Sequence, residues 1–119
     1  MRATVVDGAG YHAGTQREYG PAFAAALGYL PYPGSLNVDV DEPFVPTDAF
    51  GPSPIRISAT RTFAAWPIVL AGYDGPAHLL LWRDPDVAQH QFEIVAPDRL
   101  RPIVGTSVEI VGVYPEIIT

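Results

Sequence analysis

The sequence predicts a mainly β protein whose short strands close into a barrel, with one short helix. Thirteen prolines and eleven glycines interrupt the chain every few residues, which breaks up long helices and favours short strands joined by turns. About six or seven segments have the apolar or alternating pattern of strands, and a single segment fits a helix. Closing so many short strands into a barrel buries them and removes exposed sheet edges.

The N-terminal part of the chain is expected to contain a strand, a loop and the helix. Arg2–Val6 fits a strand, and a polar, glycine-rich loop follows at Asp7–Gln16. The helix is expected at Pro21–Leu27, where proline suits the first turn, alanines fill the helix and Gly28 can end it in a left-handed conformation. Because this helix has only about two turns, packing must stabilise it.

The rest of the chain is expected to consist of strands and turns. Tyr29–Gly34 fits a proline-stiffened turn, and Asp41–Pro54 is predicted to be a loop. Gly72–Gly75 can join two strands into a hairpin, and Arg99–Ile103 fits one helical turn. The remaining strands are expected at Leu36–Val40, Ile55–Phe63, Pro67–Leu70, Ala77–Trp82, Phe92–Val95 and Val108–Val113.

The composition narrows the class of protein. A chain of 119 residues, 48% of them hydrophobic, is expected to form a single globular domain over residues 1–119. It contains no cysteine and no lysine, which excludes thiol catalysis, cysteine zinc sites, Schiff-base chemistry and lysine-containing phosphate loops. The net charge of −6 argues against a nucleic-acid partner. No apolar stretch reaches the roughly 18 residues of a membrane helix, so we expect no membrane contact and a cytoplasmic location.

The segment Pro31–Val38 (PYPGSLNV) is the most unusual stretch of the chain. Its prolines stiffen a turn, and Gly34 allows the backbone to come close to a ligand. Ser35 and Asn37 are separated by one residue, so in an extended chain both side chains lie on the same face. A hydroxyl and an amide oxygen suit Mg²⁺ when phosphate oxygens and waters complete the coordination. The alternative is that both residues only make hydrogen bonds within the turn.

Glu93 lies within an apolar run, followed by two arginines. A carboxylate in such a run must be paired or have a raised pKa, and the second case is how general bases arise. Arg99 and Arg101 come after the break at Pro97 and can clamp phosphates. The alternative is an outward-facing glutamate on a strand, followed by a solvated basic turn.

Two further features give weaker signals. Gly8 and Gly10 directly follow the first expected strand, and glycines let backbone N–H groups approach a phosphate, although such a pair is common in ordinary loops. The three histidines do not have the spacing of a metal site. His78 is expected to be structural, whereas His90 is a candidate for the same pocket as Glu93.

Two segments, Pro31–Asn37 (PYPGSLN) and Glu93–Arg101 (EIVAPDRLR), together with the order of elements around them, resemble the CTP-dependent riboflavin kinases known mainly from archaea. The resemblance covers nearly the whole chain. It implies a six-stranded cradle-loop barrel, Mg²⁺ held by Ser35 and Asn37, and a flavin contact from Glu93. It also implies that the nucleotide is bound by Val6, Asp7, Gly8, Ala9, Gly10 and Tyr11 and by Asp98, Arg99, Leu100 and Arg101.

The chain departs from the pattern of this family in the nucleotide-binding loop and in the region that binds the acceptor. The family loop is roughly GxGEG, and the matching stretch here, Val6–Gly10, lacks the first glycine and the glutamate. A flavin-binding threonine of the family falls in the region Trp82–Asp86, where this chain has no threonine. Ser35 replaces a family threonine but keeps the hydroxyl. The metal side is therefore better preserved than the acceptor side.

The resulting hypothesis is a Mg²⁺-dependent kinase that transfers the γ-phosphoryl group of CTP to riboflavin, giving FMN, or to a related small acceptor. Glu93 would orient or deprotonate the acceptor hydroxyl. Two alternatives remain open. The chain could bind a cytidine nucleotide or flavin without turnover, or it could use the nucleotide site for other chemistry.

Overall fold

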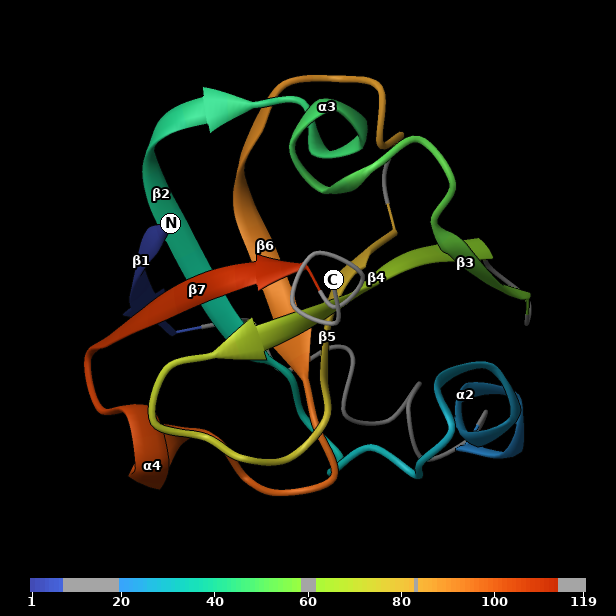
Figure 1. Ribbon diagram of the computed structural model, residues 1–119. Helices are drawn as coiled ribbons and strands as arrows, with labels where there is room; N and C mark the ends of the chain where they lie inside the picture. The colour runs from blue at the N-terminus through green and yellow to red at the C-terminus, as the bar shows by residue number, and fades with distance from the viewer. Residues whose placement is uncertain (8–19, 59–61, 83, 114–119) are drawn as a thin grey trace.

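The computed structural model describes residues 1–7, 20–58, 62–82 and 84–113, and this part of the chain is mainly β (Figure 1). Within these described ranges, seven strands form one sheet in which every pairing is antiparallel. The strands are β1 (Arg2–Val6), β2 (Leu36–Phe44), β3 (Ile55–Ser58), β4 (Thr62–Leu70), β5 (Ala77–Leu81), β6 (Gln89–Val95) and β7 (Ser107–Val113). The helices are α2 (Gly20–Leu27), α3 (Pro46–Phe50) and α4 (Arg101–Val104).

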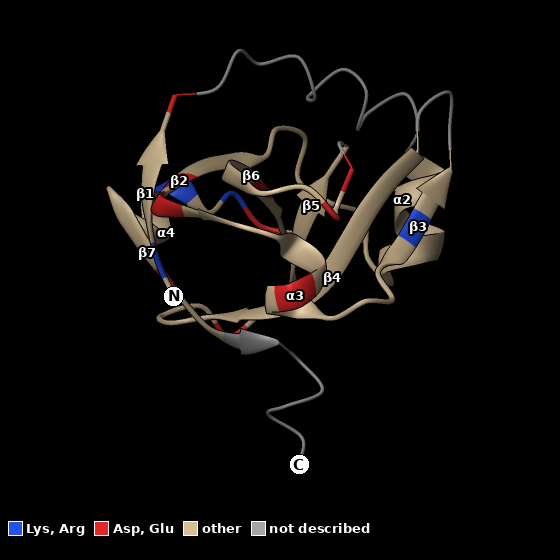
Figure 2. Cartoon of the chain, turned by 90° about the horizontal axis from the view of Figure 1, so that it is seen from above, with Lys and Arg blue, Asp and Glu red and all other residues tan. Residues whose placement is uncertain are grey.

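The order of the strands brings distant parts of the sequence together. The order is β3-β4-β5-β6-β2-β1-β7, and β4 also pairs with β7. The pairings β4-β5-β6-β2-β1-β7-β4 therefore form a closed circuit, with β3 added beside β4. Figure 2 shows the strands arranged around a ring, with α2 outside it next to β3. Within this circuit β2 lies between β1 and β6, so Asn37 is opposite Val6 on one side and Glu93 on the other.

The core has two parts, one on each face of the sheet. Leu79 and Leu80 are consecutive residues of β5, and each is almost completely buried, Leu79 in the larger cluster inside the ring and Leu80 in the smaller one outside it. This explains why all five residues of β5 are buried, since neither face of a strand that is covered on both sides is exposed to solvent. Burying one such leucine contributes about 1.5–3 kcal/mol.

Helix α2 covers the outer cluster and confirms the predicted helix. Phe23 and Leu27 are one turn apart and both are buried, so a single face of the helix packs on the sheet. The Phe23 ring lies 5.4 Å from the ring of Phe63 in β4. Gly28 has a φ of 85°, the left-handed conformation expected at the end of this helix.

The predicted loop at Asp41–Pro54 is wrong in two respects. Strand β2 continues to Phe44, and residues 46–50 form α3. Aromatic packing accounts for the difference: the Phe44 ring stacks on Phe92 at 4.6 Å and meets Phe50 of α3 at 5.5 Å. Phe92 lies 48 positions after Phe44 in the sequence, so the local composition could not indicate this packing.

The predicted single strand at Ile55–Phe63 is also wrong, because β3 ends at Ser58 and β4 begins at Thr62. β4 does not begin at Pro67, as expected, but runs through it. On one side of β4 the pairing with β3 ends at Ala65 and the pairing with β7 begins at Ile68. Pro67 lies in the gap, where a residue without an N–H disturbs the ladder little.

The remaining expectations need small adjustments. The hairpin of β4 and β5 is confirmed, whereas the helical turn expected at Arg99–Ile103 is α4 at Arg101–Val104. Strand β6 begins at Gln89, three residues earlier than expected. In the described part of the chain no helix is both long and apolar enough to cross a membrane.

Candidate functional site

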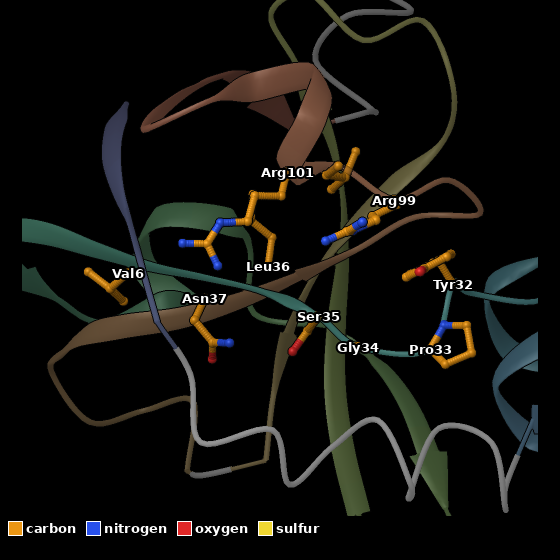
Figure 3. A pocket seen from close by; sticks show the side chains of 10 residues that line it. Val6, Tyr32, Pro33, Gly34, Ser35, Leu36, Asn37, Arg99 and Arg101 are labelled. Atoms are coloured by element: carbon orange, nitrogen blue, oxygen red, sulfur yellow. The ribbon is translucent and has the colours of Figure 1, made fainter.

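A pocket of about 340 Å³ lies where three segments meet: the end of β1, the turn that enters β2, and the turn that leads into α4 (Figure 3). These are the segments that the sequence analysis singled out separately. The pocket is lined by Val6, Tyr32, Pro33, Gly34, Ser35, Leu36, Asn37, Arg99, Leu100 and Arg101.

The turn that enters β2 is fixed by its own sequence and by β6. Pro31 and Pro33 restrict the backbone on both sides of Tyr32, and Gly34 takes a φ of 105° that other residues rarely adopt. The Tyr32 N–H donates to the Ala96 carbonyl oxygen at 2.8 Å, just after β6. The turn is therefore held against the strand that carries Glu93.

Ser35 and Asn37 lie on the same side of β2, as their spacing predicted (Figure 3). The Ser35 hydroxyl donates a hydrogen bond of 2.6 Å to Oε1 of Glu93. Asn37 is the direct cross-strand partner of the same glutamate, whose side chain is buried. A hydroxyl, an amide and a carboxylate thus gather on one face. The family resemblance implies a metal role for Ser35 and a flavin contact for Glu93, and no sequence signal connects the two residues.

Two arginines provide positive charge at the pocket. Arg101 Nη2 lies 2.7 Å from Oδ1 of Asp7, an exposed ion pair between residues 94 positions apart in the chain. Arg99 makes no hydrogen bond or ion pair with any residue that the structure describes, and its side chain is exposed. Both guanidinium groups reach toward β2 from the segment around the start of α4 (Figure 3). An exposed pair contributes little to stability, so an anionic ligand can compete for Arg101.

Tyr29 and His78 form a buried polar contact behind the proline turn. The Tyr29 hydroxyl lies 2.9 Å from His78 Nδ1 and donates to the Val95 carbonyl oxygen at 3.1 Å. The single hydroxyl proton is needed for the carbonyl, so Nδ1 of His78 carries the proton that completes the pair. Burial lowers the pKa of His78 to about 4 and raises that of Tyr29. The structural role expected for His78 is confirmed, since the side chain is buried in the sheet.

The oxygen donors at Ser35, Asn37 and Glu93 fit a hard cation such as Mg²⁺ in their chemistry. Within the described ranges, no three His, Cys, Asp or Glu side chains gather closely enough to hold a metal ion. A cation at Ser35 and Asn37 would therefore depend on additional oxygens from a bound phosphate or from water.

Comparison with protein families identifies the group to which this architecture belongs. The model of the CTP-dependent riboflavin kinase family, described as domain of unknown function DUF120, matches residues 5–109. The chain belongs to this family. A search of curated proteins found no match.

The family match covers all the site residues predicted from the sequence, and the structure brings most of the described ones together. Val6, Ser35 and Asn37 line the pocket, as do Arg99, Leu100 and Arg101. Asp7 and Glu93 do not line the pocket. Each contacts a residue that does: Asp7 forms an ion pair with Arg101, and Glu93 accepts a hydrogen bond from Ser35. Gly8, Ala9, Gly10 and Tyr11 lie outside the described residues, as does His12.

Two further candidate residues, Asp98 and His90, also do not line the pocket. Asp98 accepts a hydrogen bond of 2.9 Å from the Tyr73 hydroxyl, which fixes the start of the turn into α4. His90 is exposed on β6 and is absent from the lining of this pocket. Conversely, the sequence analysis gave no role to Tyr32, whose ring is partly exposed at the pocket. An aromatic residue between two prolines was the available signal.

Proposed function

We propose that this chain is a phosphotransferase that moves the γ-phosphoryl group of CTP to a hydroxyl of riboflavin, giving FMN and CDP, with Mg²⁺ as the metal. The observation that carries the proposal is that one pocket combines the hydroxyl and amide of Ser35 and Asn37 with the guanidinium groups of Arg99 and Arg101. Phosphoryl transfer depends on positioning and on charge neutralisation, and these are the groups that supply both.

The residues at the pocket have different proposed roles in binding the metal, the nucleotide and the acceptor. Ser35 and Asn37 would hold Mg²⁺, which when bound neutralises charge on the β- and γ-phosphates. Arg99 and Arg101 offset the remaining negative charge of the nucleotide. The fixed turn at Tyr32–Gly34 keeps one wall of the pocket rigid, so little ordering is needed on binding. Glu93 orients the acceptor hydroxyl or takes its proton at the carboxylate.

The phosphate contacts proposed here differ from those of lysine-containing phosphate loops, since the chain has no lysine. Planar guanidinium groups can bind two phosphate oxygens at once, which suits a polyphosphate. Two arginines at one pocket are a local positive patch on a chain with a net charge of −6. This patch would steer a nucleotide triphosphate toward the pocket.

We also propose that the closed circuit of six paired strands corresponds to the cradle-loop barrel of the family. The circuit runs β4-β5-β6-β2-β1-β7, with β3 added outside it. A cytoplasmic location remains a prediction from the sequence.

A second candidate function is favoured by the turn between β5 and β6. The family threonine that contacts flavin is missing there, and the turn is engaged by α3 instead. The Thr47 hydroxyl donates to Oδ1 of Asp86 at 2.9 Å, and the Thr47 N–H donates to the Pro85 carbonyl oxygen at 3.2 Å. A turn that lacks this threonine favours an acceptor other than riboflavin, or a chain that binds the nucleotide without transferring its phosphoryl group.

Calorimetric titration separates these functions. The proposed kinase binds CTP in the presence of Mg²⁺ and also binds riboflavin. A chain with a different acceptor binds CTP but not riboflavin. A flavin-binding module binds riboflavin or FMN without requiring CTP or Mg²⁺. Absence of CTP binding with Mg²⁺ present would exclude both nucleotide-dependent functions.

A further inference from the structure

We propose that Glu93 is a positioning residue for the metal ligand Ser35: its carboxylate accepts a hydrogen bond from the Ser35 hydroxyl, so that the lone pairs of Oγ remain available to the cation. This inference rests on the proposed function, because it concerns the same Mg²⁺ site. It assigns to Glu93 a task on the metal side, in addition to any contact with the acceptor.

The geometry of the contact supports this role. The distance of 2.6 Å between Ser35 Oγ and Glu93 Oε1 is in the range of a hydrogen bond from a hydroxyl to an ionised carboxylate. Such bonds are roughly twice as strong as those between neutral groups. The contact joins the residue before β2 to β6, and it gives the serine hydroxyl a defined direction.

The backbone around Glu93 keeps the carboxylate in place. Glu93 is paired with Asn37 of β2 on one side and with Leu80 of β5 on the other. Its side chain is 8% exposed, and Leu80 belongs to the apolar cluster under α2. A carboxylate held between two strands loses little further freedom when a cation binds, so the ligand set is organised in advance.

Elementary chemistry explains what the contact adds. A serine hydroxyl has one proton and two lone pairs, and it binds a cation only through the lone pairs. Without a directed acceptor, the proton can point toward the metal. A carboxylate that accepts this hydrogen bond also increases the electron density on Oγ, as the outer partners of metal ligands generally do. Asn37 needs no such partner, because its amide oxygen carries no proton.

This role differs measurably from that of a general base. A residue that acts only on the acceptor affects turnover and leaves metal binding unchanged when no acceptor is present. A residue that acts through Ser35 affects metal binding without any acceptor. Loss of an outer partner of a metal ligand typically lowers metal affinity by about 10–100-fold.

The test measures the binding of Mn²⁺ by electron paramagnetic resonance, in the presence of the non-transferable β,γ-methylene analogue of CTP and without riboflavin. The variants are Ser35→Ala, Glu93→Gln and the double variant. Ser35→Ala and Glu93→Gln are each expected to weaken Mn²⁺ binding at least tenfold. The double variant is expected to bind no more weakly than Ser35→Ala, because Glu93 acts through the hydroxyl that this variant lacks.

Three further variants serve as controls. Glu93→Asp keeps the charge but withdraws it from Oγ, so it should also weaken Mn²⁺ binding even if Glu93→Gln fails to fold. Ser35→Thr keeps the hydroxyl and should retain affinity. Glu109→Gln, the same chemical change on β7 outside the pocket, should behave as the wild type, with melting temperatures recorded throughout.

The outcomes separate the inference from the proposed function. Unchanged Mn²⁺ affinity in Glu93→Gln and Glu93→Asp would overturn the inference and leave the kinase proposal standing. Additive losses in the double variant would overturn it as well, since Glu93 would then act independently of Ser35. A wild-type chain that binds neither Mn²⁺ nor the analogue would overturn both.

Discussion

Asn37 of β2 and Glu93 of β6 are direct cross-strand partners, 56 positions apart in the sequence. The pairing places an amide and a carboxylate on one face of the sheet, beside the hydroxyl of Ser35. Neighbouring side chains in such a pair are close enough to share one ligand. The predictions that follow depend on this arrangement and on the two arginines across the pocket.

Replacement of Asn37 by alanine should weaken Mg²⁺-dependent binding of CTP by about tenfold or more. The variant removes one oxygen ligand of the cation, a charge-assisted contact worth roughly 1–3 kcal/mol. Titration of CTP with Mg²⁺ and with EDTA measures the effect, which should disappear in EDTA. Gln91→Ala, which removes an exposed amide from β6, is the control. Unchanged affinity in Asn37→Ala would show that this residue is not a ligand of the cation.

The nucleotide preference should favour CTP over ATP. The phosphate contacts proposed for Arg99 and Arg101, which line the pocket, do not depend on the base. Discrimination must therefore come from contacts to the base, and the partly exposed ring of Tyr32 lies in the same pocket. Competition of CTP, ATP and GTP for one labelled nucleotide measures the preference. Equal affinities would contradict the cytidine assignment but leave phosphoryl transfer open.

Replacement of Asp7 by asparagine should tighten the binding of CTP by a few-fold. The Asp7 carboxylate lies 2.7 Å from Arg101, so it would compete with a phosphate group for the guanidinium group. The effect should be small, since exposed ion pairs contribute about 0.2–1 kcal/mol, and it should shrink at high salt. The matched variant Arg101→Ala should weaken binding instead. Weaker binding in Asp7→Asn would indicate that the carboxylate contributes to the site, for instance to the metal.

The stability of the fold should fall in mildly acidic solution because of His78. Burial lowers the pKa of this side chain from 6.5 to about 4, so the folded state favours the neutral ring. The corresponding stability is present above pH 6.5 and is lost as the pH falls toward 4, by an amount on the order of 1–3 kcal/mol. Urea unfolding across this pH range measures it. His78→Gln should flatten the dependence, whereas the same change at the exposed His90 should not.

The sequence predicted the mainly β class of the fold and most of the residues that line the pocket. It did not predict the contacts between residues from different parts of the chain. Strand β1 and helix α2 were identified because their local pattern agrees with their packing. Helix α3 was missed because Phe50 packs against Trp66, which lies 16 positions further along the sequence and adjoins it only in the folded chain. The spacing of Ser35 and Asn37 correctly predicted that their side chains share one face, and the metal site there stays a prediction (Figure 3). The bond from Ser35 to Glu93 depends on the register of β2 and β6, and no local pattern encodes that register.

The central claim is the transfer of a phosphoryl group from CTP to riboflavin, and a turnover assay tests it most directly. The purified chain is incubated with CTP, Mg²⁺ and riboflavin, and FMN and CDP are quantified after chromatographic separation. The account predicts equal amounts of FMN and CDP, with loss of both when Mg²⁺ is removed by EDTA and a strong reduction in Asn37→Ala. No FMN from a wild-type chain that binds CTP and riboflavin would contradict the claim, and the chain would then be a binding module built on the kinase fold.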